Sequence, residues 1–117
     1  MNKKLLIDKY NVIVLDNLST GYEYNVDSRA TFINGDIRDF DCVKKTLMDY
    51  KIDAVMHFAA ALIVPESVSD PLKYYDNNLY GMQVLLNSMV KNNVNNLIFS
   101  STASVYGTQE VMPLDEN

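Results

Sequence analysis

Four short runs of mainly apolar residues recur along the chain, and polar residues or glycines bound each of them. The runs cover residues 12–15, 30–33, 54–60 and 97–99. Continuous apolar runs of this length are typical of short strands that a sheet buries on both faces. The Asp, Asn, Gly and Ser residues beside them are those that turns favour. The pattern therefore predicts four buried strands.

A helical pattern separates the second run from the third. Apolar side chains recur there at steps of three and four residues, which places them on one face of a helix. Asp39 precedes them and has the short polar side chain that caps a helix amino terminus. The residues on this face are Phe40, Val43, Leu47 and Tyr50.

A longer helical pattern lies between the third run and the fourth. Asp70 is suited to cap it and Pro71 to occupy its first turn. An apolar stripe follows, and we expect it to face either the core or a partner, with its methionines used for packing rather than as ligands. The stripe consists of Leu72, Tyr75, Leu79, Met82, Leu86 and Met89.

Strands that alternate with helices indicate right-handed βαβ units, and therefore a parallel sheet with helices on its faces. The chain has 117 residues, which is one α/β domain at most. Residues 2–9 are expected to be the end of a helix that leads into the first run, and residues 108–117 to be a loop.

Composition and charge exclude several classes of function. The formal net charge is −5, so we expect no binding to nucleic acid or to an anionic membrane surface. Cys42 and His57 are the only residues of their types, which rules out an internal disulfide and a Cys/His metal cluster. The apolar run near the start is too short for a signal peptide or a membrane span. A reducing cytoplasm is the expected location.

The first run ends in an acidic residue, Asp16, and a polar turn follows it. In a dinucleotide-binding fold the second strand ends in such an acid, which bonds the adenosine ribose, and a glycine-rich loop lies about 20 residues earlier. No glycine precedes Gly21. The stretch is therefore either an ordinary strand end with a capping aspartate, or the second strand of a Rossmann sheet whose first strand and glycine-rich loop are missing.

Five motifs decide between these alternatives by their order and spacing. They are LDNLSTG at 15–21, GDIRD at 35–39, HFAA at 57–60, PESVSDPLKYYDNN at 65–78 and FSSTASVYG at 99–107. With them the chain resembles the NAD-dependent epimerase/dehydratase family of extended short-chain dehydrogenases/reductases over nearly its whole length. The resemblance implies that residues 1–117 form a partial NAD-binding Rossmann domain, and that the domain binding the sugar nucleotide is absent.

The resemblance implies a cofactor site at the ends of the first two strands. Asp16 and Asn17 match residues that hold the adenosine ribose, and a carboxylate there favours NAD over NADP because it repels a 2′-phosphate. Asp36 and Ile37 match a pair that contacts adenine. The carboxylate of Asp36 would accept a hydrogen bond from the exocyclic amine, and Ile37 would cover the ring face.

The third strand and the long helix are expected to contribute further cofactor contacts. Phe58, Ala59 and Ala60 match a segment that passes beside the pyrophosphate and the nicotinamide ribose, where small residues allow a close approach. Asn77 matches an amide that reaches toward the cofactor from the helix, and Asn78 is a close competitor for this role.

The catalytic assignment is limited to one hydroxyl. Thr102 aligns with the active-site Ser/Thr of the family, which shares a hydrogen bond with the sugar C4 oxygen and helps a tyrosinate remove its proton. That tyrosine belongs to a Tyr-x-x-x-Lys motif, and none of the chain's tyrosines is followed by lysine at the fourth position. The motif is expected beyond Asn117. His57 is expected to be a core residue without a chemical role.

Within the family the motifs are most similar to the 4-epimerases, which interconvert UDP-glucose and UDP-galactose through a 4-keto sugar with bound NAD. The resemblance implies a fragment that is inactive alone and binds NAD weakly, from an enzyme that forms a homodimer through its long helix. Related dehydratases or uronate epimerases share the cofactor motifs and stay open as alternatives. So does a non-catalytic remnant that interacts through the long helix.

Overall fold

Two pairs of parallel strands form the framework of the protein. The computed structural model describes residues 2–102 and 107, and the predicted loop at 108–117 lies outside them. Strand β1 (Ile13–Asp16) pairs with β2 (Thr31–Asn34), and β3 (Ala54–His57) pairs with β4 (Asn96–Phe99). All four predicted strands are confirmed, with ends shifted by up to three residues.

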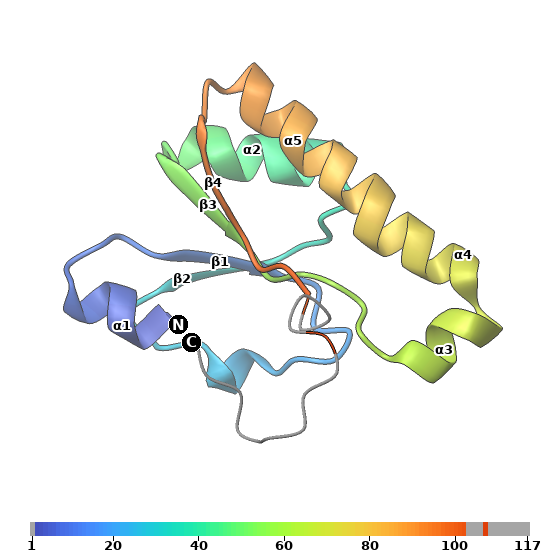
Figure 1. Cartoon of the computed structure of the whole chain (residues 1–117). Coiled ribbons are helices and arrows are strands. Elements are labelled where there is room, and N and C mark those ends of the chain that lie inside the picture. Colours follow the sequence, from blue (N-terminus) through green and yellow to red (C-terminus); the bar gives the residue numbers. More distant parts are fainter. Residues whose placement is uncertain (1, 103–106, 108–117) are drawn as a thin grey trace.

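The two pairs are separate sheets within the described part of the chain, because no ladder joins β1 to β3. Both pairs run from the outside of the molecule inwards, so the carboxyl ends of the strands converge near its centre (Figure 1). The fold is α/β with parallel strands flanked by helices, as the sequence predicts. A carboxylate at the end of β1 is thus brought toward the ends of the other three strands.

Helices begin where the capping residues predict. Helix α2 (Phe40–Asp49) begins after Asp39, whose side chain accepts a 3.0 Å hydrogen bond from the amide of Cys42. Helix α1 (Asn2–Ile7) confirms the predicted helix ahead of the first strand. The sequence patterns did not indicate a short 3-10 turn η1 (Glu23–Asn25) or helix α3 (Val64–Ser69), because neither has enough residues to show a period.

The long helix is continuous but changes its winding. Asp70 caps α4 (Pro71–Tyr74), a π-helical segment η2 (Tyr75–Tyr80) follows, and α5 (Gly81–Lys91) completes the run. The wider π turn shifts the helical phase, and the predicted stripe divides into two faces. Leu72, Tyr75, Leu79 and Leu86 are exposed, whereas Met89 is buried and Met82 packs against the core.

The hydrophobic core lies where α2 and α5 pack on one face of the β3–β4 pair. Its buried members are Ile37, Val43, Leu47, Val84, Leu85, Met89 and Val94. Gly81 is required for this packing, since a Cβ atom there would lie 2.9 Å from the Cγ2 atom of Ile37. Within the described residues, no helix is both long and apolar enough to cross a membrane.

Candidate functional site

The candidate site lies where the carboxyl ends of the strands meet. In open parallel sheets, ligands bind in the crevice outside these ends. Asp16 ends β1, residues 58–60 follow β3, and Thr102 lies three residues after β4. The structure therefore brings the motifs predicted to hold a cofactor to one region of the molecule, at the centre of Figure 1.

The loop after β1 folds back toward the Asp16 carboxylate. Oδ1 of Asp16 accepts a 2.7 Å hydrogen bond from the amide of Leu18, and Oδ1 of Asn17 accepts one of 3.0 Å from the amide of Ser19. A Cβ atom at Gly21 would lie 3.6 Å from both carboxylate oxygens of Asp16. Asp16 is exposed. A carboxylate has about four acceptor positions, so the side chain retains capacity for two ribose hydroxyls.

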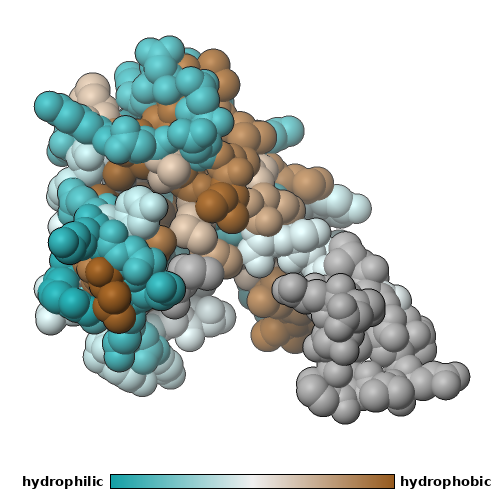
Figure 2. Space-filling view, turned by 60° about the vertical axis from the view of Figure 1, so that its left-hand side comes forward, coloured by the Kyte–Doolittle hydropathy of each residue, from teal (hydrophilic) through white to brown (hydrophobic). Residues whose placement is uncertain are grey.

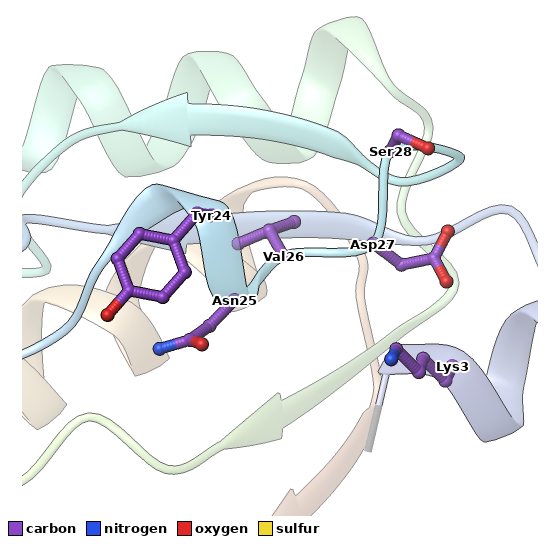
Figure 3. Close-up of a pocket in the computed structure, with 6 residues that line it drawn as sticks. All are labelled: Lys3, Tyr24, Asn25, Val26, Asp27 and Ser28. Carbon is purple, nitrogen blue, oxygen red and sulfur yellow. The ribbon is translucent and has the colours of Figure 1, made fainter.

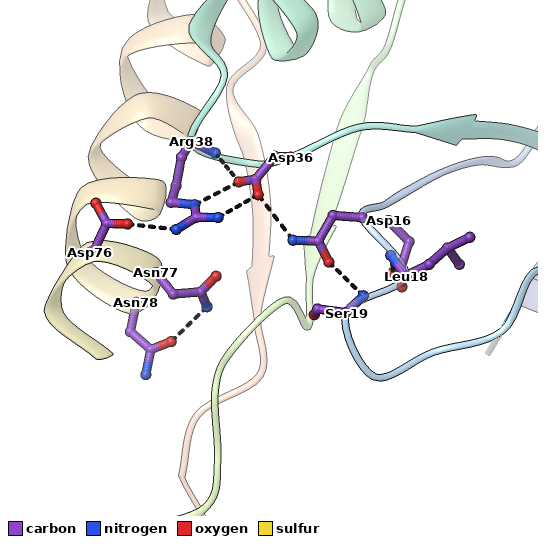
Figure 4. Close-up of polar contacts among 9 residues, drawn as sticks. Asp16, Leu18, Ser19, Asp36, Arg38, Asp76, Asn77 and Asn78 are labelled. Carbon is purple, nitrogen blue, oxygen red and sulfur yellow. Dashed lines mark hydrogen bonds and ion pairs between the residues drawn. The ribbon is translucent and has the colours of Figure 1, made fainter. Parts of the chain in front are cut away.

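Asp36 is the centre of a charged network between three segments of the chain (Figure 4). Its Oδ1 accepts 2.9 Å hydrogen bonds from both the amide and Nε of Arg38, and its Oδ2 accepts one of 2.7 Å from Nη2. Nδ2 of Asn17 donates to Oδ2 of Asp36 at 3.0 Å. Nη1 of Arg38 pairs with Asp76 in the π turn. The network joins the ends of β1 and β2 to the long helix.

The electrostatics of this network favour fixed charges. The hydrogen bonds from Arg38 hold the pKa of the Asp36 carboxyl well below its usual range, and Asn17 adds to that shift. The bonds to Asp36, followed by those to Asp76, raise the pKa of Arg38. Asp36 therefore remains an anionic acceptor near neutral pH, as recognition of an adenine amine requires.

Ile37 points away from this network. Only 8% of its surface is exposed, and its side chain packs in the core against Gly81. Little of the side chain is left to cover an aromatic ring, and its contact with adenine stays a prediction. The neighbours Asp36 and Arg38 lie on the polar side of the same short segment, which therefore serves the core and the candidate site together.

The long helix holds the segment after β3 through an amide. Oδ1 of Asn78 accepts a 2.9 Å hydrogen bond from the amide of Ala61, and its Nδ2 donates to the carbonyl of Ala61 at 3.1 Å. Nδ2 of Asn77 donates to Oδ1 of Asn78 at 2.9 Å. Residues 58–60 precede Ala61, which these two hydrogen bonds clamp to Asn78, and they are exposed. Asn78 therefore positions the predicted cofactor segment, while Asn77 contacts it through Asn78.

The end of β4 lies beside the end of β3. The amide of Ser100 donates to the carbonyl of His57 at 3.1 Å, and Thr102 follows in an exposed position. His57 is 6% exposed and stacks on Phe99 with 5.6 Å between the ring centroids. Burial lowers the pKa of His57, so the ring is neutral at pH 7. The prediction of a core histidine is confirmed.

Two residues that position the site, Arg38 and Asp76, were missed from the sequence, and a third, Asn78, was named only as the alternative to Asn77. Arg38 offered a signal, because it stands two residues after Asp36 within the GDIRD motif. Asp76 offered none, since its partner Arg38 is 38 positions away and meets it only through the π turn. Asn78 was weighed against Asn77, and helical spacing alone does not distinguish adjacent amides when the winding changes.

A pocket of about 430 Å³ lies away from the carboxyl ends of the strands, between α1 and the loop before β2 (Figure 3). Its lining is Lys3, Tyr24, Asn25, Val26, Asp27 and Ser28. The pocket is open and largely polar, whereas ligand pockets are usually apolar clefts with a few convergent polar groups. It also lies near the amino ends of β1 and β2. The strand carboxyl ends thus remain the candidate site.

Comparisons with known proteins identify the family of the chain. The model of a family described as "NAD dependent epimerase/dehydratase family" matches residues 1–117. A UDP-glucose 4-epimerase of Lactobacillus helveticus is 51% identical over 115 residues, which cover 98% of this chain and 35% of that protein. The chain thus spans about a third of the length of this curated relative.

Solved structures give the same result. A crystal structure of a UDP-glucose 4-epimerase matches with a TM-score of 0.87 and 43% identity, covering 98% of this chain and 35% of that one. The enzyme from Bifidobacterium longum, solved in complex with NAD⁺ and UDP, matches with a TM-score of 0.86 and 38% identity, covering 98% and 36%. The arrangement of strands and helices described above is therefore that of these proteins.

Proposed function

The chain belongs to the NAD dependent epimerase/dehydratase family, and we propose that it forms the adenosine-binding part of an NAD site in a UDP-sugar 4-epimerase. The observation that supports this most is the position of Asp16, an exposed carboxylate at the end of β1 with a folded turn around it. Its charge would accept both ribose hydroxyls of NAD and repel the 2′-phosphate of NADP.

The described residues would contact the adenosine, the pyrophosphate and the nicotinamide ribose of such a cofactor. Asp16 and Asn17 would hold the adenosine ribose, and Asp36 would accept from the adenine amine with Ile37 beside it. The exposed residues Phe58, Ala59 and Ala60 would pass along the pyrophosphate and the nicotinamide ribose. The glycine-rich loop that commonly holds a pyrophosphate has no counterpart before Gly21, so we expect weak binding.

In the proposed reaction the residues of this chain bind and orient rather than carry the principal acid or base. NAD, when bound, supplies the acceptor and donor of the hydride at C4 of the sugar. The hydroxyl of Thr102 would accept a hydrogen bond from the C4 hydroxyl, or donate one to its oxygen, and so hold that proton in line for a base. Asn78 keeps the segment after β3 in place through the backbone of Ala61.

The proposed substrates are UDP-glucose and UDP-galactose, and the proposed location is the cytoplasm. The relatives and solved structures described above, all UDP-glucose 4-epimerases, support this choice over a dehydratase or a uronate epimerase. The chain contains no Tyr-x-x-x-Lys motif, and activity therefore requires residues that this sequence does not supply. We expect the 117-residue chain to be inactive alone.

A segment exchange tests this function. Residues 1–117 would replace the matching third of the Lactobacillus helveticus enzyme, with which they share 51% identity. The chimera is expected to convert UDP-galactose to UDP-glucose. Thr102→Val in the chimera should reduce kcat about 10²-fold or more, while Thr102→Ser should stay near the parent value. A folded chimera that binds NAD and lacks epimerase activity would contradict the proposal.

NAD binding is tested in the same chimera by titration. Asp16→Ala should weaken the binding of NAD at least ten-fold. Asp16→Asn should reduce the preference for NAD over NADP, because the charge that repels the 2′-phosphate is removed. Asp49→Asn, at the end of α2 and outside the site, is the matched control and should leave both affinities unchanged. If Asp16→Ala and Asp49→Asn weaken the binding of NAD equally, Asp16 does not hold the adenosine ribose.

We also propose that the long helix pairs with its copy in a homodimer of the intact protein. Leu72 is 75% exposed and Val90 is 75% exposed, and Tyr75, Leu79 and Leu86 are exposed between them. Apolar side chains in a row on one helix are typical of an interface. Leu79→Glu in the chimera should shift the molecule to a monomer in sedimentation, whereas Lys73→Glu should leave its mass unchanged.

A further inference from the structure

The segment that follows β3, residues 58–63, is held by hydrogen bonds more than by packing, and we call it the β3 loop. Phe58, Leu62 and Ile63 in this loop expose much of their apolar side chains. Hydrophobic surface of this kind also lies across the middle of the molecule, between more hydrophilic regions above and below (Figure 2). Apolar contacts therefore do not fix the path of the β3 loop, and its polar contacts have to do so.

The backbone of the β3 loop is tied to the long helix. Among the described residues, one hydrogen bond lies within the loop itself, from the amide of Ala60 to the carbonyl of Phe58 at 3.0 Å. That bond spans a single residue and does not connect the loop to the rest of the molecule. The side chain of Asn78 makes such a connection, because it binds both the amide and the carbonyl of Ala61.

A second connection to the long helix is made by a tyrosine hydroxyl. The Oη atom of Tyr74 donates to the carbonyl of Ile63 at 2.7 Å, and Tyr74 precedes Asn78 by four residues on the same helix. The carbonyl of Ile63 also accepts a 3.0 Å hydrogen bond from the amide of Ser67, within α3. Tyr74 therefore contacts the β3 loop at the residue after which α3 begins.

An acidic residue shares the Tyr74 hydroxyl. Oε2 of Glu66 accepts from Tyr74 at 2.7 Å, and its Oε1 pairs with Nζ of Lys73. The bond from Lys73 lowers the pKa of the Glu66 carboxyl, while partial burial and the bond to Glu66 raise the pKa of Tyr74. Near neutral pH the carboxyl is therefore charged and the hydroxyl keeps its proton. That proton is shared between Glu66 and the carbonyl of Ile63.

The two connections divide the β3 loop into a fixed part and an exposed part. Ala61 and Ile63 are bonded to the long helix, and residues 58–60 ahead of them are exposed. The proposed function places the pyrophosphate and the nicotinamide ribose of NAD along residues 58–60, where the backbone has to come close to the cofactor. A loop that is ordered beforehand loses less conformational entropy when a ligand binds to it.

We propose that Tyr74 is a positioning residue of the cofactor site, whose hydroxyl holds the β3 loop in the path that NAD requires. It acts through the carbonyl of Ile63 and not through contact with NAD. Asn78 holds the same loop from the π-helical segment η2, which begins directly after Tyr74. The inference rests on the proposed function, because it takes residues 58–60 as part of the NAD site.

The first test measures amide hydrogen exchange by NMR without NAD, in the 117-residue chain and in the chimera that contains it. Tyr74→Phe removes the hydroxyl and keeps the ring. The amides of Ala61 and Ser67, on either side of Ile63, should exchange about five-fold faster or more, because a hydrogen bond that holds the loop is lost. Tyr80→Phe, the same change on an exposed ring of the same helix, is the matched control and should leave both rates unchanged.

NAD titration of the chimera measures the consequence for the cofactor. Tyr74→Phe should weaken the binding of NAD about five-fold. The value of kcat at saturating NAD should stay within about two-fold of the parent, because no group that touches the reacting atoms is removed. A role in stability alone would lower the melting temperature and leave the affinity for NAD unchanged, and that result would overturn the proposal.

A further variant separates the hydroxyl from the ion pair. Glu66→Gln keeps an acceptor oxygen for Tyr74 and removes the charge that faces Lys73. The affinity for NAD should therefore stay within about two-fold of the parent. If Glu66→Gln weakens the binding of NAD as much as Tyr74→Phe does, the ion pair holds the loop and the proposal is wrong.

The remaining outcomes are also decisive. Loss of cooperative thermal unfolding in Tyr74→Phe would assign the hydroxyl to the stability of the whole domain, which overturns the proposal. Unchanged exchange at Ala61 and Ser67 would do the same. A parent chimera that binds no NAD would contradict the proposed function instead. The exchange rates, measured without NAD, would then still show whether Tyr74 holds the β3 loop, so the two failures are distinct.

Discussion

The half of the molecule built on β3 and β4 and the half built on β1 and β2 are stabilised differently. The first half, with α2 and α5, contains nearly all of the buried apolar core. The second contributes Asp16, Asn17 and Asp36, whose contacts are hydrogen bonds and ion pairs. Buried apolar contacts are therefore concentrated in one half, and the groups predicted to hold the adenosine of NAD lie in the other.

A five-residue segment joins the two halves. Ile37 packs into the core, while its neighbours Asp36 and Arg38 form the charged network. The GDIRD segment therefore contributes both to the core and to the charged network. Substitutions in the core should change stability most, those in the connecting segment less, and those at exposed charges least.

The largest expected effect is the loss of core volume. Leu85→Ala removes a side chain that is 6% exposed and should lower the free energy of unfolding by about 2–5 kcal/mol. Leu86→Ala, the next residue on α5, is 42% exposed and should change it by less than about 1 kcal/mol. Urea denaturation followed by circular dichroism measures both. Similar values for the two variants would refute the assignment of the core to this half.

The second prediction concerns the junction of the halves. A Cβ atom at Gly35 would lie 2.5 Å from the Sγ atom of Cys42. Gly35→Ala should therefore destabilise the protein by about 1–3 kcal/mol, because β2 and α2 would have to separate. The double variant Gly35→Ala, Cys42→Ala removes the sulfur and should recover most of the loss. Absence of recovery in thermal unfolding would assign the effect to the backbone instead.

The third prediction tests the charged network by pH. Arg38→Met should lower the free energy of unfolding by about 1 kcal/mol at pH 7. Since the pKa of folded Asp36 is lowered, its contribution is present above about pH 4 and is lost as the pH falls below that value. The difference in the free energy of unfolding between Arg38→Met and the parent, measured by urea denaturation, should therefore shrink below that pH.

Arg29→Met is the matched control for this experiment. Arg29 pairs with Asp27, two residues away, and the pair bridges no second segment. Its loss should lower the free energy of unfolding by much less than the loss of Arg38, because the arginine of this pair is exposed to solvent. If both arginine variants show the same loss, the connection from Arg38 to Asp76 contributes nothing to stability.

The smallest predicted effect belongs to His57. Burial lowers its pKa, so the folded state favours the neutral ring. Its contribution is full above the ordinary pKa of about 6.5 and falls as the pH drops through the window below that value. Between pH 7 and pH 5.5 the free energy of unfolding of the parent should fall by less than about 1 kcal/mol through this group. The free energy of unfolding of His57→Gln should fall by a smaller amount over the same range. Identical pH profiles would contradict the buried neutral ring.

The sequence predicted the elements because local signals agree with the tertiary structure there. Asp39 and Asp70 cap helices as expected, and the four apolar runs are strands. It also predicted that Asp16 would end a strand of a sheet interrupted on one side, since no glycine precedes Gly21. The strands and caps depend on residues within a few positions of each other, whereas the interpretation of Asp16 depends on five motifs spread over residues 15–107.

What the sequence did not predict depends on long-range packing. The regular spacing from Leu72 to Met89 suggested a single face, and the π turn divides it. The contact of Arg38 with Asp76 and the clamp of Asn78 on Ala61 span 38 and 17 positions, which no local pattern encodes. The core position of Ile37 was likewise not indicated by its motif, and its contact with adenine stays a prediction.

Because residues 75–80 are wound as a π-helix, the protein is sensitive to a change in the length of this segment. Removing a single residue from that segment would restore ordinary α-helical pitch and rotate everything before it by about 100° relative to α5. Asn78 would then swing away from Ala61, and Asp76 from Arg38. A one-residue deletion there should consequently be more harmful than the replacement of any one of these side chains, although it shortens an exposed helix by a fraction of a turn.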